Sequence, residues 1–192
     1  MTYQTTSSTS TSWIDFNDAE TQQSFDLLPK GTLVKVRMTL KPGGFNDPSQ
    51  NWTGGYATRN ATSDTVYLNC EFVILEGQYA KRKVWSKIGL HSPKSPEWAK
   101  MGRSFVKAIL QSARGISEKD MSPQAVTGRR IHNLSELDGI DFIARIDVEK
   151  DQRNGEDRNV IKMAITPDHK DYGSVSVTAT PSSKSLPSWA QQ

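Results

Sequence analysis

Apolar and polar side chains alternate with a period of two in five segments of this 192-residue sequence. Successive side chains of a β-strand point to opposite faces, so this alternation predicts strands that are buried on one side only. The segments are residues 34–41, 66–74, 79–90, 140–148 and 160–165. Cys70, the single cysteine, is at an inward position of the second segment. The pattern therefore predicts a mainly β protein without an internal disulfide.

One segment has the periodicity of a helix. Ser95 and Pro96 are suited to its start, and Gly115 is suited to its end. Between them, apolar residues recur at spacings of three and four. The predicted buried stripe contains Trp98, Met101, Gly102, Phe105, Val106, Ile109, Leu110 and Ala113. The predicted order of elements is three strands, one helix and two strands.

A long connection, residues 41–65, joins the first two predicted strands and shows no periodicity. Connections of this length tend to be functional or mobile. Its aromatic residues Phe45, Trp52 and Tyr56 lie among glycines and close to Arg59 in the sequence. These rings could swing onto unstacked bases or fold back as an apolar lid over the sheet. The sequence leaves both alternatives open.

The last two predicted strands are joined through Asn154 and Gly155, a pair that is typical of a tight hairpin. The resulting order is that of the oligonucleotide-binding (OB) fold, a five-stranded, partly open barrel whose middle strands and loops bind ligands. We therefore expect an all-β domain with one helix over residues 13–170. The Ser- and Thr-rich residues 1–12 predict a disordered arm, and residues 171–192 predict a flexible tail.

The charges divide the chain into three parts. Residues 1–29 hold four acids and no Lys or Arg, residues 30–114 hold fourteen bases and five acids, and residues 115–192 hold ten bases and twelve acids. A basic middle part between acidic flanks suits a polyanionic partner. The sequence shows neither a signal peptide nor an apolar run of membrane-spanning length, so we expect a cytoplasmic protein without a membrane partner.

The segment 79–90 carries the main candidate binding surface. Its basic residues share one side with Trp85, opposite the apolar Val84, Ile88 and Leu90. Lysines neutralise phosphates, and an indole can stack on a base, which contributes about 1–3 kcal/mol per base. Alternatively, this side only protects a sheet edge from aggregation. The candidate nucleic-acid-binding residues are Lys35, Arg37, Trp52, Tyr56, Arg59, Tyr67, Lys81, Lys83, Trp85 and Lys87.

Four parts of the sequence resemble a widespread group of small phage and prophage proteins. These are residues 25–32, residues 70–85, the predicted helix, and residues 137–150. Such proteins are usually regarded as single-stranded-DNA-binding or recombination-associated and are often encoded beside replication genes. The likeness runs over about residues 13–170. In this group a Gly often precedes the Arg-Lys-aromatic step, whereas Lys81 takes that place here.

Catalytic motifs are not recognisable in the sequence. His91, His132 and His169 are scattered, paired cysteines are absent, and the Gly-Gly pairs lack the context of a phosphate-binding loop. We therefore expect no enzyme activity, no metal and no cofactor. The outward acids Asp141, Asp147 and Glu149 would be the residues of a metal-dependent nuclease, although solvated surface is their ordinary explanation.

Two functions follow as hypotheses. The protein coats single-stranded DNA during phage or prophage DNA replication or recombination, or it is an OB-fold adaptor for a recombinase or replication protein. In the second case the contacts would be the aromatic loop or the tails that carry Trp13 and Trp189. The sequence does not decide between DNA and RNA, nor whether the protein forms a homo-oligomer.

Overall fold

The computed structural model describes residues 14–21, 26–151 and 153–175. Its strands are β1 (Thr32–Lys41), β2 (Phe45–Asp47), β3 (Trp52–Asn60), β4 (Thr65–Ile74), β5 (Lys83–His91), β6 (Asp141–Lys150) and β7 (Asp157–Ala164). The helices are α1 (Pro96–Arg114) and α2 (Pro123–Gly128), with short 3-10 helices η1 (Pro48–Gln50), η2 (Leu134–Leu137) and η3 (Tyr172–Ser174). In the described part of the chain, α1 is the one long helix.

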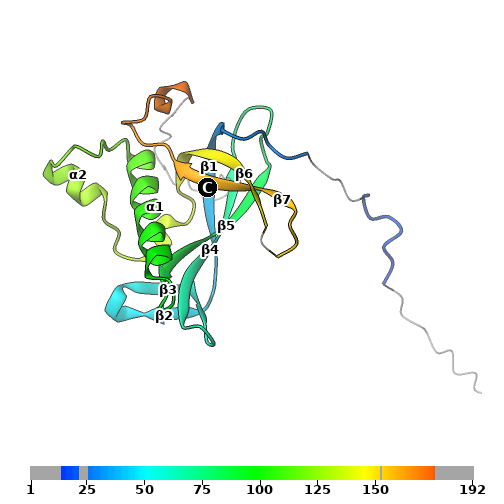
Figure 1. The fold of residues 1–192 in the computed structure, drawn as a ribbon, viewed down its shortest axis with the longest axis horizontal. Helices are drawn as coiled ribbons and strands as arrows, with labels where there is room; N and C mark the ends of the chain where they lie inside the picture. The colour runs from blue at the N-terminus through cyan, green and yellow to red at the C-terminus, as the bar shows by residue number, and fades with distance from the viewer. Residues whose placement is uncertain (1–13, 22–25, 152, 176–192) are drawn as a thin grey trace, which may run out of the picture.

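The strands form one antiparallel sheet that curls into a half-barrel (Figure 1). Its order is β2-β3-β4-β1-β6-β7, and β5 pairs with the other edge of β4. The first three strands predicted from the sequence correspond to β1, β4 and β5, which are antiparallel neighbours. Among the described strands, none pairs with the second edge of β5 or of β7. The barrel is therefore open between these two strands.

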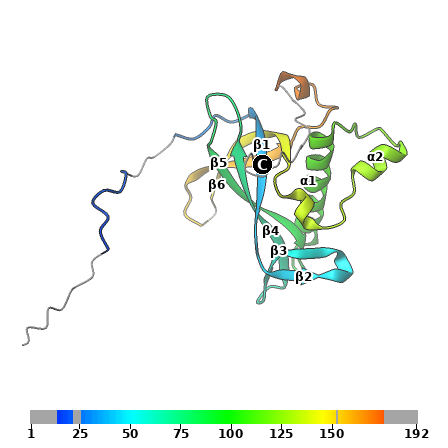
Figure 2. The same cartoon turned by 180° about the vertical axis from the view of Figure 1, so that it is seen from behind.

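The core lies on the concave side of the sheet, under α1. Met38, Leu68 and Phe72 are fully buried there, as the alternation predicts. Cys70 is also buried, as predicted. The ring of Phe142 meets Phe72 edge to face at a centroid distance of 5.9 Å. Because α1 contacts β5, β6 and β7, it covers the apolar residues that the open barrel would otherwise expose (Figures 1 and 2).

Two glycines bring α1 directly onto β5. A Cβ atom at Gly102 of the helix would overlap with the carbonyl oxygen of Gly89, and one at Gly89 would lie 2.6 Å from Cε3 of Trp98. Both approaches are closer than real Cβ atoms allow. Trp98 is therefore part of this helix–strand packing, as the sequence predicts.

The limits of α1 agree with the prediction, but part of its predicted buried stripe is wrong. The helix begins at Pro96, and Gly115 ends it with a φ of 65°. Met101, however, is 67 % exposed. Met163 of β7, also predicted inward, is 38 % exposed because a register shift after Arg145 places Met163 opposite this outward residue.

The predicted five-strand order is wrong, because residues 41–65 contain two further strands. They form the hairpin β2–η1–β3, and β3 pairs with β4 through Ala57 and Leu68. Glycines with positive φ at Gly44, Gly54 and Gly55 interrupt the alternation of side chains, which explains why the sequence shows no period there. The short helix α2 was likewise not predicted as a definite element.

The structure describes the chain up to residue 175, and η3 packs near the end of α1. Tyr172 donates a hydrogen bond through its hydroxyl to the carbonyl oxygen of Ser112, at 2.9 Å. The predicted arm (residues 1–12) and most of the predicted tail (residues 176–192), with Trp13 and Trp189, lie outside the described residues.

A Gly102→Ala substitution tests the close packing of α1 on β5. Alanine favours a helix over glycine by up to about 1 kcal/mol, whereas overpacking costs about 1–3 kcal/mol. Because the added Cβ meets backbone rather than a flexible side chain, we expect the free energy of unfolding to fall by about 1–3 kcal/mol, measured by urea denaturation. Ser104→Ala, at an exposed position of the same helix, should change it little. A Gly102→Ala protein as stable as wild type would contradict this packing.

Candidate nucleic-acid interface

The side of β1, β4 and β5 that faces away from the core forms the candidate interface, called the outer face below. The strand registers align its residues in three rows. These rows are Arg37, Val73 and Lys83; Thr39, Glu71 and Trp85; and Lys41, Asn69 and Lys87. Residues directly opposite each other on neighbouring strands interact through their side chains. The outer face is therefore a continuous array with basic residues on two of its three strands.

Glu71 is the central group of the outer face. Its carboxylate lies 3.1 Å from Lys83 Nζ and 3.5 Å from Lys41 Nζ, and it accepts a 3.1 Å hydrogen bond from Trp85 Nε1. The Lys83 contact is the main cause that lowers the pKa of Glu71 below its usual value, while burial opposes this shift. A charged carboxylate thus links both outer strands to β4.

Trp85 is the most accessible aromatic group on this face, with 59 % of the residue exposed. Its indole nitrogen is held by Glu71, while Lys83 and Lys87 lie two residues away on either side along β5. An indole that uses its polar edge in one fixed hydrogen bond keeps its flat faces for other contacts. The arrangement therefore presents an oriented aromatic surface between two cations.

Tyr67 and Lys87 form a second pair on the outer face. Lys87 Nζ lies 4.5 Å from the centroid of the Tyr67 ring, within the range of a cation–π interaction. One face of the half-buried Tyr67 ring is therefore occupied by a cation. In this arrangement Tyr67 positions Lys87 beside Trp85.

Arg37 and Lys35 lie on β1, towards the other end of the outer face. Arg37 makes a bidentate ion pair with Asp141 of β6, with Nε–Oδ1 and Nη2–Oδ2 distances of 2.7 and 2.9 Å. This hydrogen-bonded pairing raises the pKa of Arg37 further above its usual value. Lys35 is half-buried and lies beside Ser174 and Val175. Arg37 is thus tied to β6, whereas Lys83 is tied to β4 through Glu71.

Lys81 does not share the strand side on which it was predicted. β5 begins only at Lys83, and Lys81 has a φ of 69° in the preceding turn. Its N–H donates to the carbonyl oxygen of Ile74 at 2.8 Å, which closes the turn. The alternation predicted from residue 79 onwards is therefore interrupted at this turn.

Trp52, Tyr56 and Arg59 belong to the β2–β3 hairpin instead of the rows on β1, β4 and β5. Trp52 and Tyr56 are partly buried and pack against the core, which is the lid alternative. Arg59 lies opposite the buried Val66, and so on the core-facing side of the sheet. It forms an ion pair with Asp64 at 2.6 Å and lies over the Phe45 ring. The structure thus separates this hairpin from Trp85.

The candidate binding residues proposed from the sequence did not include Glu71 and Lys41, which both belong to the outer face. Both lie at outward positions of the period-two pattern, so the sequence does predict the face of the sheet on which they lie. Their meeting with Trp85 depends on the pairing of Thr39 with Glu71 and of Glu71 with Trp85. The residue pattern of a single strand does not show which of its residues pair with which residues of the neighbouring strand.

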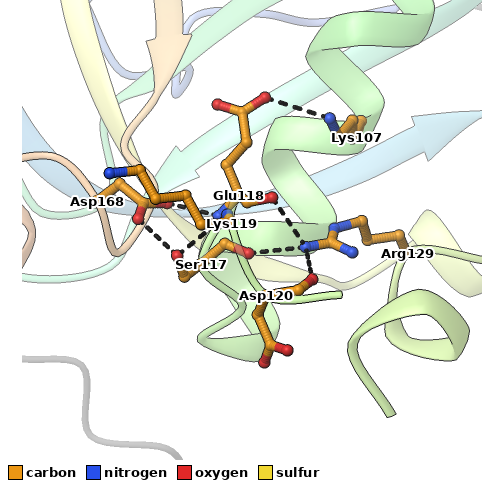
Figure 3. Close-up of polar contacts among 7 residues, drawn as sticks. All are labelled: Lys107, Ser117, Glu118, Lys119, Asp120, Arg129 and Asp168. Carbon is orange, nitrogen blue, oxygen red and sulfur yellow. Dashed lines mark hydrogen bonds and ion pairs between the residues drawn. The ribbon is translucent and has the colours of Figure 1, made fainter. Parts of the chain in front are cut away.

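A second polar cluster joins the loop after α1 to α2 and the C-terminal segment (Figure 3). Arg129 donates to the carbonyl oxygens of Ser117 and Asp120 at 2.7 and 2.6 Å, and Asp168 accepts hydrogen bonds from Ser117 Oγ and the Glu118 N–H, both at 2.6 Å. These contacts stabilise a loop conformation. The same loop places Glu118 3.3 Å from Lys107 of α1.

No model of a known protein family matches the sequence, and no curated protein matches it at a significant level. The resemblance to phage and prophage proteins therefore stays a prediction. Within the described residues, no group of three or more His, Cys, Asp or Glu residues is placed to hold a metal ion. No described helix has the length and apolar character that crossing a membrane requires.

The charge of Glu71 can be tested by its pH dependence. Because the folded protein lowers the pKa of this carboxyl, its ionised form contributes stability above the usual value of about 4.5, and that stability is lost as the pH falls through the folded-state pKa. We expect Glu71→Gln to reduce the free energy of unfolding at pH 7 by roughly 1 kcal/mol. The difference from wild type should shrink between pH 5 and about pH 3, measured by urea denaturation.

Glu76→Gln, in the exposed turn before β5, is the matched control and should have little effect at any of these pH values. If the difference in the free energy of unfolding between wild type and Glu71→Gln stays constant down to pH 3, the carboxylate charge is not the source of the stabilisation.

Proposed function

We propose that this protein is a non-enzymatic single-stranded-DNA-binding protein that uses the outer face of β1, β4 and β5. The observation that carries the proposal is the exposed Trp85 ring, oriented by Glu71 and placed between Lys83 and Lys87. Unpaired bases expose flat faces that duplex DNA conceals, and an oriented indole can stack on them. The flanking lysines supply contacts for the adjoining phosphates.

The charge balance of the outer face supports the same partner. Four of its basic residues are Arg37, Lys41, Lys83 and Lys87; Arg37 pairs with Asp141, and Lys41 and Lys83 pair with Glu71. Glu71 binds two of these lysines through exposed ammonium groups, whose side chains are about half accessible. Because these ammonium groups remain half exposed, a phosphate can replace water around the lysines while the buried Glu71 still orients Trp85.

We also infer that the half-barrel is an elaborated OB-like barrel. Without the β2–β3 hairpin, the order β1, β4, β5, α1, β6, β7 is that of the OB fold, whose ligands bind on the second and third strands. Those strands correspond here to β4 and β5, which carry Tyr67, Trp85 and Lys87. The sequence resemblance supports a role in phage or prophage DNA replication or recombination inside the cell.

Titration of a labelled single-stranded oligonucleotide tests the proposal. Trp85→Ala should weaken binding by about 5- to 150-fold, because loss of one stacking contact costs about 1–3 kcal/mol. Lys83→Gln combined with Lys87→Gln should lower the slope of log affinity against log salt by about 1.4, since each phosphate contact on a single strand contributes about 0.7. Fluorescence anisotropy between about 50 and 200 mM salt measures both quantities.

Two controls separate the outer face from the rest of the molecule. Lys94→Gln removes an exposed base in the loop before α1 and should leave the salt slope unchanged. Trp52→Ala should reduce stability more than affinity, because Trp52 packs against the core. If wild-type protein shows no salt-sensitive preference for single-stranded over double-stranded DNA, the proposal is wrong and the adaptor hypothesis is favoured.

A further inference from the structure

A groove of about 700 Å³ lies where the half-barrel is open, between α1, β5 and β7. Apolar side chains from all three elements line it, among them Ile88, Trp98, Met101, Phe105 and Met163. Met101 and Met163 are the two exposed methionines whose inward prediction was wrong. Both line this groove and remain exposed there among the described residues.

Gln111 provides a second, independent observation at the same groove. This residue is only 3 % exposed and lines the groove, yet its Nε2 has no hydrogen-bond partner among the described residues. A buried amide donor without an acceptor is unfavourable, so such groups are normally satisfied. The groove thus contains a donor that is suited to an acceptor, such as a peptide carbonyl, from an incoming segment.

The strands on both sides of the groove can also receive a peptide. Within the described sheet, β5 pairs only with β4, and β7 pairs only with β6. Each therefore has one edge without a hydrogen-bonded partner strand, although the two strands contact each other over part of their length. An extended peptide commonly binds at such an edge, with its backbone on the strand and its apolar side chains in adjacent pockets.

The N-terminal segment, residues 14–20, has the chemistry that fits this groove. Ile14 is 82 % exposed and Phe16 is 73 % exposed. Acidic residues follow them closely, namely Asp15, Asp18 and Glu20. In both views of the fold this segment, drawn in blue, lies clear of the domain that contains the groove (Figures 1 and 2). It is an acidic peptide with two apolar side chains available for burial.

The rim of the groove is more basic than acidic. Lys87, Lys100, Lys107 and Lys162 line it together with Glu97 and Glu118. Lys107 and Glu118 form an exposed pair at 3.3 Å, visible in Figure 3, and Lys100 lies 4.0 Å from Glu97. Lys162 is paired as well, with Glu149 at 2.8 Å. Exposed pairs of this kind contribute little, so these lysines can turn to the carboxylates of a docked peptide.

We propose that residues 14–20 of one copy of the chain dock in the α1–β5–β7 groove of a second copy. Ile14 and Phe16 then cover the exposed methionines, a backbone carbonyl of the segment accepts from Gln111 Nε2, and the acidic residues face the rim lysines. In a dimer formed by this head-to-tail contact, one copy keeps a free N-terminal segment and the other keeps a free groove. Further copies can therefore add at either end and form an array. The proposal does not depend on DNA binding.

Sedimentation velocity of the full-length protein, without DNA, tests this inference over about 5–500 µM. Wild type should self-associate as its concentration rises. Ile14→Asp combined with Phe16→Asp should weaken association at least tenfold, and so should Met101→Glu. Met121→Glu is the matched control, because Met121 is 75 % exposed but does not line the groove. All four positions are exposed, so the substitutions should leave the fold intact.

Mixing the two defective variants separates docking between copies from docking within one chain. The Met101→Glu chain keeps an intact segment, and the Ile14→Asp/Phe16→Asp chain keeps an intact groove, so an equimolar mixture should form heterodimers that neither variant forms alone. The inference is overturned if wild type stays monomeric over the whole range, if Met121→Glu weakens association as much as Met101→Glu, or if the mixture contains only monomers.

Discussion

The hydrogen bonding of β4 on both of its edges is the constraint on which the rest of the structure depends. One edge pairs with β5 from Val66 to Val73, and the other is shared by β3 and β1. The inward residues of β4 form the centre of the core, where burial raises the pKa of the Cys70 thiol to about 12. Glu71 is one of the residues of β4 that face outward. The core and the candidate interface are therefore the two faces of one strand.

Glu71 shows how a basic surface can be ordered without losing its attraction for anions. Lys41 of β1 and Lys83 of β5 flank β4, and the Glu71 carboxylate between them reduces their mutual repulsion. The same carboxylate fixes the edge of Trp85 by a hydrogen bond, while the lysine side chains remain about half exposed. One acidic group therefore stabilises the sheet and orients the ring that we propose as the stacking surface.

The open barrel gives the molecule two distinct surfaces. The outer face is polar, basic and built on the register of β1, β4 and β5, whereas the groove combines apolar side chains with a charged rim and lies where β5 and β7 do not pair. Lys87 belongs to the lining of the groove and also lies above Tyr67 on the outer face. A segment docked in the groove would lie close to the proposed DNA surface without covering Trp85.

The sequence by itself determined β1, β4, β5, β6 and β7, the limits of α1, the burial of Cys70 and the Lys–Trp character of β5, because these depend on periodicity and capping within one segment. Only the tertiary structure decided the β2–β3 hairpin, which glycines conceal, and the exposure of Met101 and Met163. It also decided that Trp52 and Arg59 lie apart from Trp85, and that Glu71 meets Lys83. These relations depend on strand register and twist, which join residues that are distant in the chain and leave no local pattern.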